Sequence, residues 1–201
     1  MAYQDLSKFK VPAEFRGRSK VFVQLWWIAQ ATLFRCSPQV AYGYRRAILR
    51  LFGAKVGQGV LIRSSVKITY PWKVTLGDHC WVGDNVNLYS LGEISIGKNA
   101  VVSQESYLCT GDHDHADPTF AIRARPICID EEAWVAAGTF IAPGVTIGTA
   151  AVIGARSLVF ADMPPRMICR GSPCVPVRAR EAAGQEDSAQ IVHLKTASSH
   201  R

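Results

Sequence analysis

The chain has 201 residues, 19% of them charged and 48% hydrophobic, which is the composition of an ordinary soluble protein with one domain. Its net charge of +7 is uneven, because residues 1–73 carry 13 Lys and Arg against two acids, a net +11, while residues 74–201 carry a net −4. The basic third predicts either an anionic partner surface or a solvated helix face. The chain shows no nucleic-acid recognition motif with interleaved aromatic residues, so we expect no nucleic acid partner.

The six cysteines form no Cys-x-x-Cys pair and no metal-ligand spacing, so we expect no metal. The first residues are polar and charged, unlike a signal peptide. We therefore expect reduced thiols and a cytoplasmic protein, with the inner face of the membrane as a further possible location.

Residues 1–53 are expected to form an arm and helices that cap one end of the fold. The arm, 1–19, is polar and predicted to be extended. Residues 20–35 are apolar nearly all round and too short to span a bilayer, which favours a helix packed on the fold over one laid in a membrane interface. Ser37 and Pro38 predict the start of a second helix that ends at Gly53. Its expected core stripe is Tyr44, Ile48, Leu51 and Phe52, with Arg45, Arg46 and Arg50 away from it.

An aliphatic residue recurs at every sixth position in three triplets and then in one unbroken run. These fifteen residues are Val56, Ile62, Ile68, Leu76, Val82, Leu88, Ile96, Val102, Leu108, Ile129, Val135, Ile141, Ile147, Ile153 and Val159. A period of six fits neither a helix nor a plain strand pair, but it suits short strands joined by tight corners into triangular coils. We therefore predict a mainly β protein, a parallel β-helix over 54–178, in preference to a β-sandwich. Gly follows many of these residues, and we expect Gly and Asn to allow positive φ at the corners.

Residues 109–128 leave this ladder and are expected to form an extruded loop. The loop contains His113 between Asp112 and Asp114, and a histidine beside a carboxylate is typical of a general base. His115 is more typical of a binding or surface residue. Cys109 follows a ladder residue directly, so we interpret it as a buried structural thiol, with an acyl-accepting nucleophile as the alternative. From 179 to 201 the chain is polar and small, which predicts a disordered tail.

The repeat resembles that of the hexapeptide-repeat acyltransferases, whose coils are left-handed. The stretches 49–57, 70–72, 107–114 and 143–148 resemble the colanic-acid-type acetyltransferase branch, which makes or decorates surface polysaccharides, and the resemblance covers roughly residues 3 to 178. It implies acetyl-CoA as co-substrate, O-acetylation of a sugar hydroxyl by direct transfer, and a homotrimer with sites between subunits.

The resemblance also implies roles for particular residues. His113 matches the catalytic base, and Asn85 matches a contact to the acceptor sugar, although a corner Asn and the neighbouring Asn87 remain alternatives. The chain departs from the family pattern at Phe160, Ala161 and Val175, which weakens the coenzyme assignment. The expected acceptor contacts are Asn85, Asp112, Asp114 and His115. The expected coenzyme contacts are Trp134, Ala137, Ala155, Arg156 and Arg178, with Arg170 nearby.

Three other functions stay open from the sequence. N-acylation of an amino sugar needs the same donor and fold. A zinc hydro-lyase like the gamma-class carbonic anhydrases needs three histidines on adjacent coils, and His79 does not have that spacing. A non-enzymatic scaffold could use the basic third to organise a membrane-bound polysaccharide complex, but it gives no reason for the histidines and acids of the loop.

Overall fold

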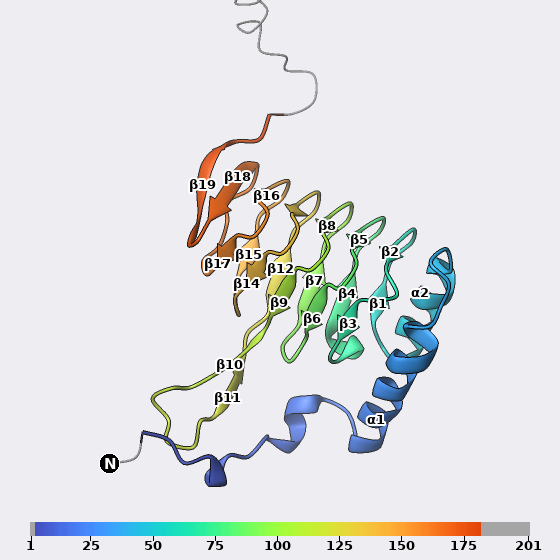
Figure 1. Ribbon diagram of the computed structural model, residues 1–201, viewed down its shortest axis with the longest axis vertical. Coiled ribbons are helices and arrows are strands. Elements are labelled where there is room, and N and C mark those ends of the chain that lie inside the picture. The colour runs from blue at the N-terminus through green and yellow to red at the C-terminus, as the bar shows by residue number, and fades with distance from the viewer. Residues whose placement is uncertain (1–2, 182–201) are drawn as a thin grey trace, which may run out of the picture.

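The computed structural model describes residues 3–181 and is a parallel β-helix with helices at its N-terminal end (Figure 1). Each coil contributes one short strand to each of three sheets, so the solenoid is a triangular prism. The first sheet contains β1 (Lys55–Val56), β4 (Val74–Leu76), β7 (Ile94–Ile96), β12 (Ile127–Ile129) and β15 (Thr146–Ile147). The second contains β2 (Leu61–Ile62), β5 (Trp81–Val82), β8 (Val101–Val102), β13 (Trp134–Val135), β16 (Val152–Ile153), β18 (Met167–Gly171) and β19 (Cys174–Ala179). The third contains β3 (Lys67–Ile68), β6 (Asn87–Tyr89), β9 (Tyr107–Cys109), β14 (Phe140–Ile141) and β17 (Leu158–Val159).

The predicted ladder of aliphatic residues is confirmed as the core of the prism. Ladder residues pair with one another in register from coil to coil, as in Val82 with Val102 and Val102 with Val135. Fourteen of the fifteen are at most 1% exposed, and only Val56, in the terminal coil, is half-buried. One aliphatic side chain per strand therefore stacks into a continuous column that no single coil could bury alone.

The corners need residues of two kinds, one that adopts a positive φ and one without a Cβ, and the sequence analysis treated the two as one. Left-handed residues fall at the third position after a ladder residue, as at His79 (φ 58°) and Asn85 (φ 56°). The glycines directly after ladder residues have a different reason, because a Cβ on Gly77 would lie 2.6 Å from the backbone nitrogen of Lys98 in the next coil. There, glycine allows close approach of adjacent coils rather than a positive φ.

Two helices cover the open N-terminal end of the prism. α1 (Lys20–Ala29) continues into one π-helical segment, η3 (Gln30–Phe34), and buries Trp26, whose indole N–H donates to the carbonyl of Ile68 at 2.9 Å. α2 (Tyr42–Leu51) begins four residues later than Pro38, so the predicted start was wrong.

The predicted apolar stripe of α2 was right for Ile48, which is buried, and for Phe52, which packs against the core, but wrong for its other two members. Tyr44 and Leu51 are 46% and 78% exposed, whereas Arg45 is fully buried beside Ile48 and Leu49. The arginines turn inward because the first coil has no preceding coil to bond its carbonyls. Arg45 donates to Ile62 at 2.7 Å, Arg46 to Val60 at 2.9 Å, and Arg50 to Val56 at 2.7 Å.

The arm before α1 is not simply extended. It holds the 3₁₀ turns η1 (Leu6–Lys8) and η2 (Ala13–Arg16), and a third turn, η4 (Pro71–Lys73), lies between two coils. Trp72 donates to the carbonyl of Arg16 at 2.7 Å, which ties the arm to the solenoid. At the other end, β19 extends to Ala179, the first residue of the expected tail 179–201. Residues 182–201 of that tail lie outside the described residues. No helix in residues 3–181 has the length and hydropathy needed to cross a membrane.

Candidate active site

The predicted loop 109–128 contains an antiparallel hairpin that leaves the prism between the third and first sheets (Figure 1). Its strands are β10 (Gly111–His113) and β11 (Ile122–Ala124). One face of the hairpin is charged, because Asp112 pairs with Arg123 at 3.1 Å and with Arg125 at 3.0 Å, and Asp114 lies 3.6 Å from Arg123. These acids therefore hold the hairpin together.

His113 faces the opposite side of β10, because successive side chains of a strand alternate. Its Nδ1 lies 2.8 Å from the carbonyl oxygen of Phe120, and its ring stacks on the Phe120 ring with centroids 4.1 Å apart. Phe9 of the arm closes a second side, at a centroid distance of 5.7 Å. Neither of the flanking acids, Asp112 and Asp114, orients the imidazole, since both carboxylates engage arginines and a backbone carbonyl takes that role.

The Phe120 carbonyl determines which nitrogen of His113 can act as a base. A carbonyl oxygen only accepts, so the hydrogen bond requires the proton on Nδ1. The neutral ring then presents the lone pair of Nε2. His113 is half-buried, so this nitrogen is held on a fixed ring.

The base of the hairpin is anchored by a small hydrophobic cluster outside the main core. Val23 of α1, Tyr70 and Leu91 are its buried members, and Phe15 of the arm packs against them. The remaining neighbours are Trp72, Tyr89, Ile122 and Ala124. The arm also reaches the hairpin tip, where the Asp5 N–H donates to the carbonyl of Pro118 at 2.7 Å.

Four of the expected acceptor and coenzyme residues lie on another edge of the prism, between the second and third sheets. Asn85 follows β5, Ala137 follows β13, and Ala155 and Arg156 follow β16, so the four stack along one line of corners. The Arg156 N–H donates to the carbonyl of Ala137 at 2.8 Å. Asn85 is an exposed corner residue in the left-handed conformation, as its structural alternative predicted.

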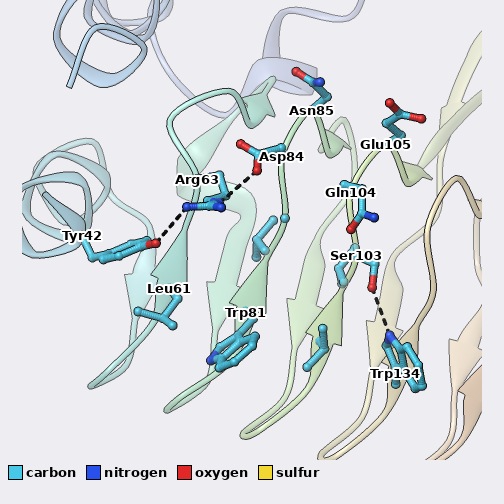
Figure 2. A pocket seen from close by; sticks show the side chains of 14 residues that line it. Tyr42, Leu61, Arg63, Trp81, Asp84, Asn85, Ser103, Gln104, Glu105 and Trp134 are labelled. Atoms are coloured by element: carbon cyan, nitrogen blue, oxygen red, sulfur yellow. Dashed lines mark hydrogen bonds and ion pairs between the residues drawn. The ribbon is translucent and has the colours of Figure 1, made fainter. Parts of the chain in front are cut away.

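A groove of about 750 Å³ runs along the second sheet beside this edge (Figure 2). Its floor presents two exposed indoles, Trp81 and Trp134, and the Trp134 N–H donates to Ser103 at 3.0 Å. Arg63 bridges Asp84 and the Tyr42 hydroxyl at 3.0 and 3.1 Å. The groove thus combines aromatic faces with amide and carboxylate groups, including Asn85 and Glu105. Aromatic faces can pack against the apolar side of a hydroxylated ring, and the polar groups can bond its hydroxyls.

The structure separates other expected residues from this groove. His115 is exposed in the hairpin tip, and Arg170 and Arg178 are exposed on β18 and β19 at the far end of the solenoid. With the side chains of residues 13 and 14 left aside, residues 3–181 contain no cluster of three His, Cys, Asp or Glu side chains that could ligate a metal. His113 does not line the groove, so one chain alone does not bring this histidine and the groove together.

Phe9, Phe15 and Phe120 are site residues that the sequence analysis missed. Phe120 stands inside the off-ladder segment, so its position was a usable signal. Phe9 gave none, because only the folded arm brings it to His113. Cys109 is half-buried, and its thiol donates to the carbonyl of Gly111 at 3.2 Å, which fits a structural role.

The sixfold ladder, triangular coils and His-bearing hairpin define a hexapeptide-repeat β-helix. No family model matches the chain. A protein of Escherichia coli K12 named as a colanic acid biosynthesis acetyltransferase, WcaF, is 61% identical over 177 residues, which are 88% of this chain and 97% of that protein. A galactoside O-acetyltransferase of the same organism is 28% identical over 137 residues, 67% of this chain and 68% of its own. The chain belongs to the family of colanic acid biosynthesis acetyltransferases.

Solved structures agree on the fold. A galactoside acetyltransferase in complex with coenzyme A superposes with a TM-score of 0.76 at 22% identity, covering 89% of this chain and 96% of that one. A hexapeptide-repeat acetyltransferase of Vibrio cholerae complexed with acetyl coenzyme A gives 0.73 at 21% identity, covering 81% and 89%. The expected left-handed parallel β-helix and the expected enzyme class, acetyltransferase, are both confirmed.

Proposed function

We propose that this chain transfers the acetyl group of acetyl-CoA to a hydroxyl of a sugar acceptor in surface polysaccharide biosynthesis, with His113 as general base. The observation that carries the proposal is the hydrogen bond from Nδ1 to the Phe120 carbonyl, which leaves Nε2 for the acceptor. The 61% identity to WcaF supports the reaction class and the pathway.

In this mechanism the Nε2 lone pair of His113 takes the proton of the acceptor hydroxyl. The acceptor oxygen attacks the thioester carbonyl, the C–S bond breaks, and the imidazolium returns its proton to the departing thiolate. No acyl-enzyme forms. Backbone N–H groups of the corners near Ala137 and Ala155 would stabilise the developing oxyanion and line the pantetheine arm of the donor.

The proposed site is completed by a neighbouring subunit of a homotrimer. The hairpin stands on one edge of the prism, and Asn85, Ala137 and the Trp134 groove stand on another. A threefold arrangement places the first edge of one copy against the second edge of the next, so three equivalent sites form. Light scattering tests the oligomer, and a stable, active monomer would refute it.

Subunit mixing tests the shared site directly. His113→Asn removes the base, and Ala137→Trp blocks the proposed donor channel on the other edge. If each site uses both edges from different subunits, randomly mixed trimers should regain about a quarter of wild-type turnover, although each variant alone is inactive. Mixed subunits that stay inactive would place the whole site within one chain.

The acceptor is tested by a screen with acetyl-CoA and thiol detection. Sugars, nucleotide sugars and lipid-linked glycans are the arms, and an amino sugar tests N-acylation, which the same donor geometry allows. Mass analysis of the product then identifies the modified atom. Thiol release with none of the acceptors would contradict sugar acylation.

We also propose a cytoplasmic location with peripheral membrane contact through the N-terminal helices.

A further inference from the structure

The outer face of α1 is apolar although the helix already packs on the solenoid. Its inner face buries Val23, Trp26 and Ala29. On the outer face, Val21, Leu25 and Ile28 follow at helical spacing and are 70%, 52% and 61% exposed. A contiguous apolar stripe of this kind on a soluble protein marks a candidate interaction surface.

Basic residues surround this stripe. Arg18 and Lys20 precede it, Arg35 follows it, and all three are exposed. The sequence contains no Asp or Glu between Glu14 and Asp78, although it contains eleven Lys and Arg there. Five of these are engaged within the protein: Arg45, Arg46 and Arg50 bond coil carbonyls, Arg63 pairs with Asp84, and Lys73 donates to the carbonyls of Phe15 and Leu91. The other six supply the surface charge.

A hollow of about 210 Å³ lies beside the stripe, between α1, η3 and the first coil. Arg35 and Lys67 line it together with Ser64, Ser65 and the half-exposed indole of Trp27. Among the described side chains, which are those of residues 3–181 except 13 and 14, no acid pairs with Arg35 or Lys67. Asp84, which Ser65 contacts, is paired with Arg63. The Ser65 hydroxyl donates to Asp84, so two cations and the Ser64 hydroxyl beside an indole are the groups that suit a phosphate at a membrane interface.

We propose that the face made of Val21, Leu25, Trp27 and Ile28, with Arg35 and Lys67 beside it, docks on an anionic phospholipid surface. The apolar side chains enter the acyl boundary, and the cations meet lipid phosphates. A second copy of the chain is the less suitable occupant, because a self-complementary contact would bring the same cations together. The inference does not depend on the acetyl transfer.

Docking through α1 would orient the hairpin relative to the lipid. The arm runs from α1 to the hairpin along one side of the prism (Figure 1). Phe15 and Val23 join the cluster at the hairpin base, and Phe9 contacts His113. The docking face and the base-bearing hairpin therefore belong to one continuous packed segment.

Co-sedimentation of the full chain with vesicles tests the proposal. Phosphatidylcholine vesicles are compared with vesicles that also contain phosphatidylglycerol, at low and high salt. We expect binding to the anionic vesicles only, weakened by salt. Sodium phosphate should displace the protein no more than sodium chloride at equal ionic strength. Equal binding to both vesicle types, no binding, or specific displacement by phosphate would overturn the proposal.

Two pairs of variants separate the apolar and the charged contributions. Leu25→Asn with Ile28→Asn, and Arg35→Gln with Lys67→Gln, should each weaken anionic binding by on the order of tenfold. The matched control is Val177→Asn, a 47% exposed position on β19 at the far end, which should bind like wild type. If the Leu25 and Ile28 pair instead changes the molecular mass in light scattering and leaves vesicle binding intact, the face is a protein contact and the proposal fails.

Discussion

The Nδ1 atom of His113 lies 2.8 Å from the carbonyl oxygen of Phe120, seven residues further along the same hairpin. This hydrogen bond sets the tautomer of His113 from within the hairpin, because the backbone carbonyl does what a carboxylate would otherwise do. The flanking acids are then available for Arg123 and Arg125, which brace the opposite face.

Replacing His113 should abolish turnover without abolishing donor binding. We expect His113→Ala to lower kcat by on the order of 10²–10⁴, because the base acts in the transition state and contributes little to acetyl-CoA affinity. Steady-state kinetics and calorimetric binding of acetyl-CoA measure the two effects.

His115→Ala provides the internal control, since the residue is exposed two positions away. It should change mainly the acceptor KM, by less than about tenfold. A normal kcat in His113→Ala with a lost kcat in His115→Ala would mean that the base is assigned to the wrong histidine. Normal turnover in both variants would show that neither histidine of the hairpin is the general base.

Phe9 and Phe120 should act as positioning residues for His113. Each ring holds the imidazole through an aromatic contact, at 5.7 and 4.1 Å between centroids. An aromatic pair contributes about 0.5–1.5 kcal/mol beyond its area, so Phe9→Leu and Phe120→Leu should each lower kcat by about two- to tenfold. The KM for acetyl-CoA should stay unchanged.

Tyr3→Leu is the matched control for the arm, because Tyr3 is 96% exposed. It should have wild-type kinetics. A fall in kcat in the control equal to that of Phe9→Leu would show that the arm acts generally and not through the His113 ring.

Arg45 should be a major contributor to stability. It is fully buried and donates to the carbonyls of Ile62, Pro38 and Gln39 and to the Ser37 hydroxyl. Arg45→Met keeps the volume but leaves these acceptors unsatisfied, at a cost of on the order of 3 kcal/mol. For a chain of this size the melting temperature should fall by about 10 °C.

Arg50→Met is the comparison for Arg45→Met. Arg50 also bonds coil carbonyls, but it is exposed, so water can replace it. Its melting temperature should fall much less. If the melting temperature fell equally in the two variants, the burial of Arg45 would add nothing to the stability that its hydrogen bonds to the carbonyls provide.

The sequence predicted the coils well because one buried side chain per strand is enough to define them. Val82, Val102 and Val135 pair in register although the spacings between them, which include two extra residues before Ile96 and the loop 109–128, are not multiples of six. The sequence wrongly placed Arg45 on the solvated face of its helix, because a charged residue in a helix is normally exposed. Only the folded structure shows the backbone carbonyls that Arg45 bonds in the protein interior.

The candidate site was predictable in part. His113 stood out because it lies off the ladder beside acids, but its orienting group is a backbone atom, which no residue pattern encodes. Phe9 comes from the arm, far away in the sequence, so its contact depends on the tertiary path of the arm. Asn85 and His113 lie on different edges of the prism, and the order of the strands along the chain is enough to predict this. The separation fits a single site only if a second subunit brings the two edges together.

Cys109 should be dispensable for turnover if transfer is direct. Its thiol donates to the Gly111 carbonyl at 3.2 Å, and serine can donate the same hydrogen bond. Cys109→Ser should therefore keep kcat within about twofold of wild type, because the base step would be untouched. Intact-protein mass spectrometry after mixing with acetyl-CoA alone should show no added acetyl group on the wild-type chain. For comparison, burial raises the pKa of the Cys80 thiol to about 12, so alkylation at neutral pH should spare Cys80 and modify the exposed Cys36 first. A stable acetyl adduct on Cys109, together with loss of turnover in Cys109→Ser, would replace direct transfer by a covalent route.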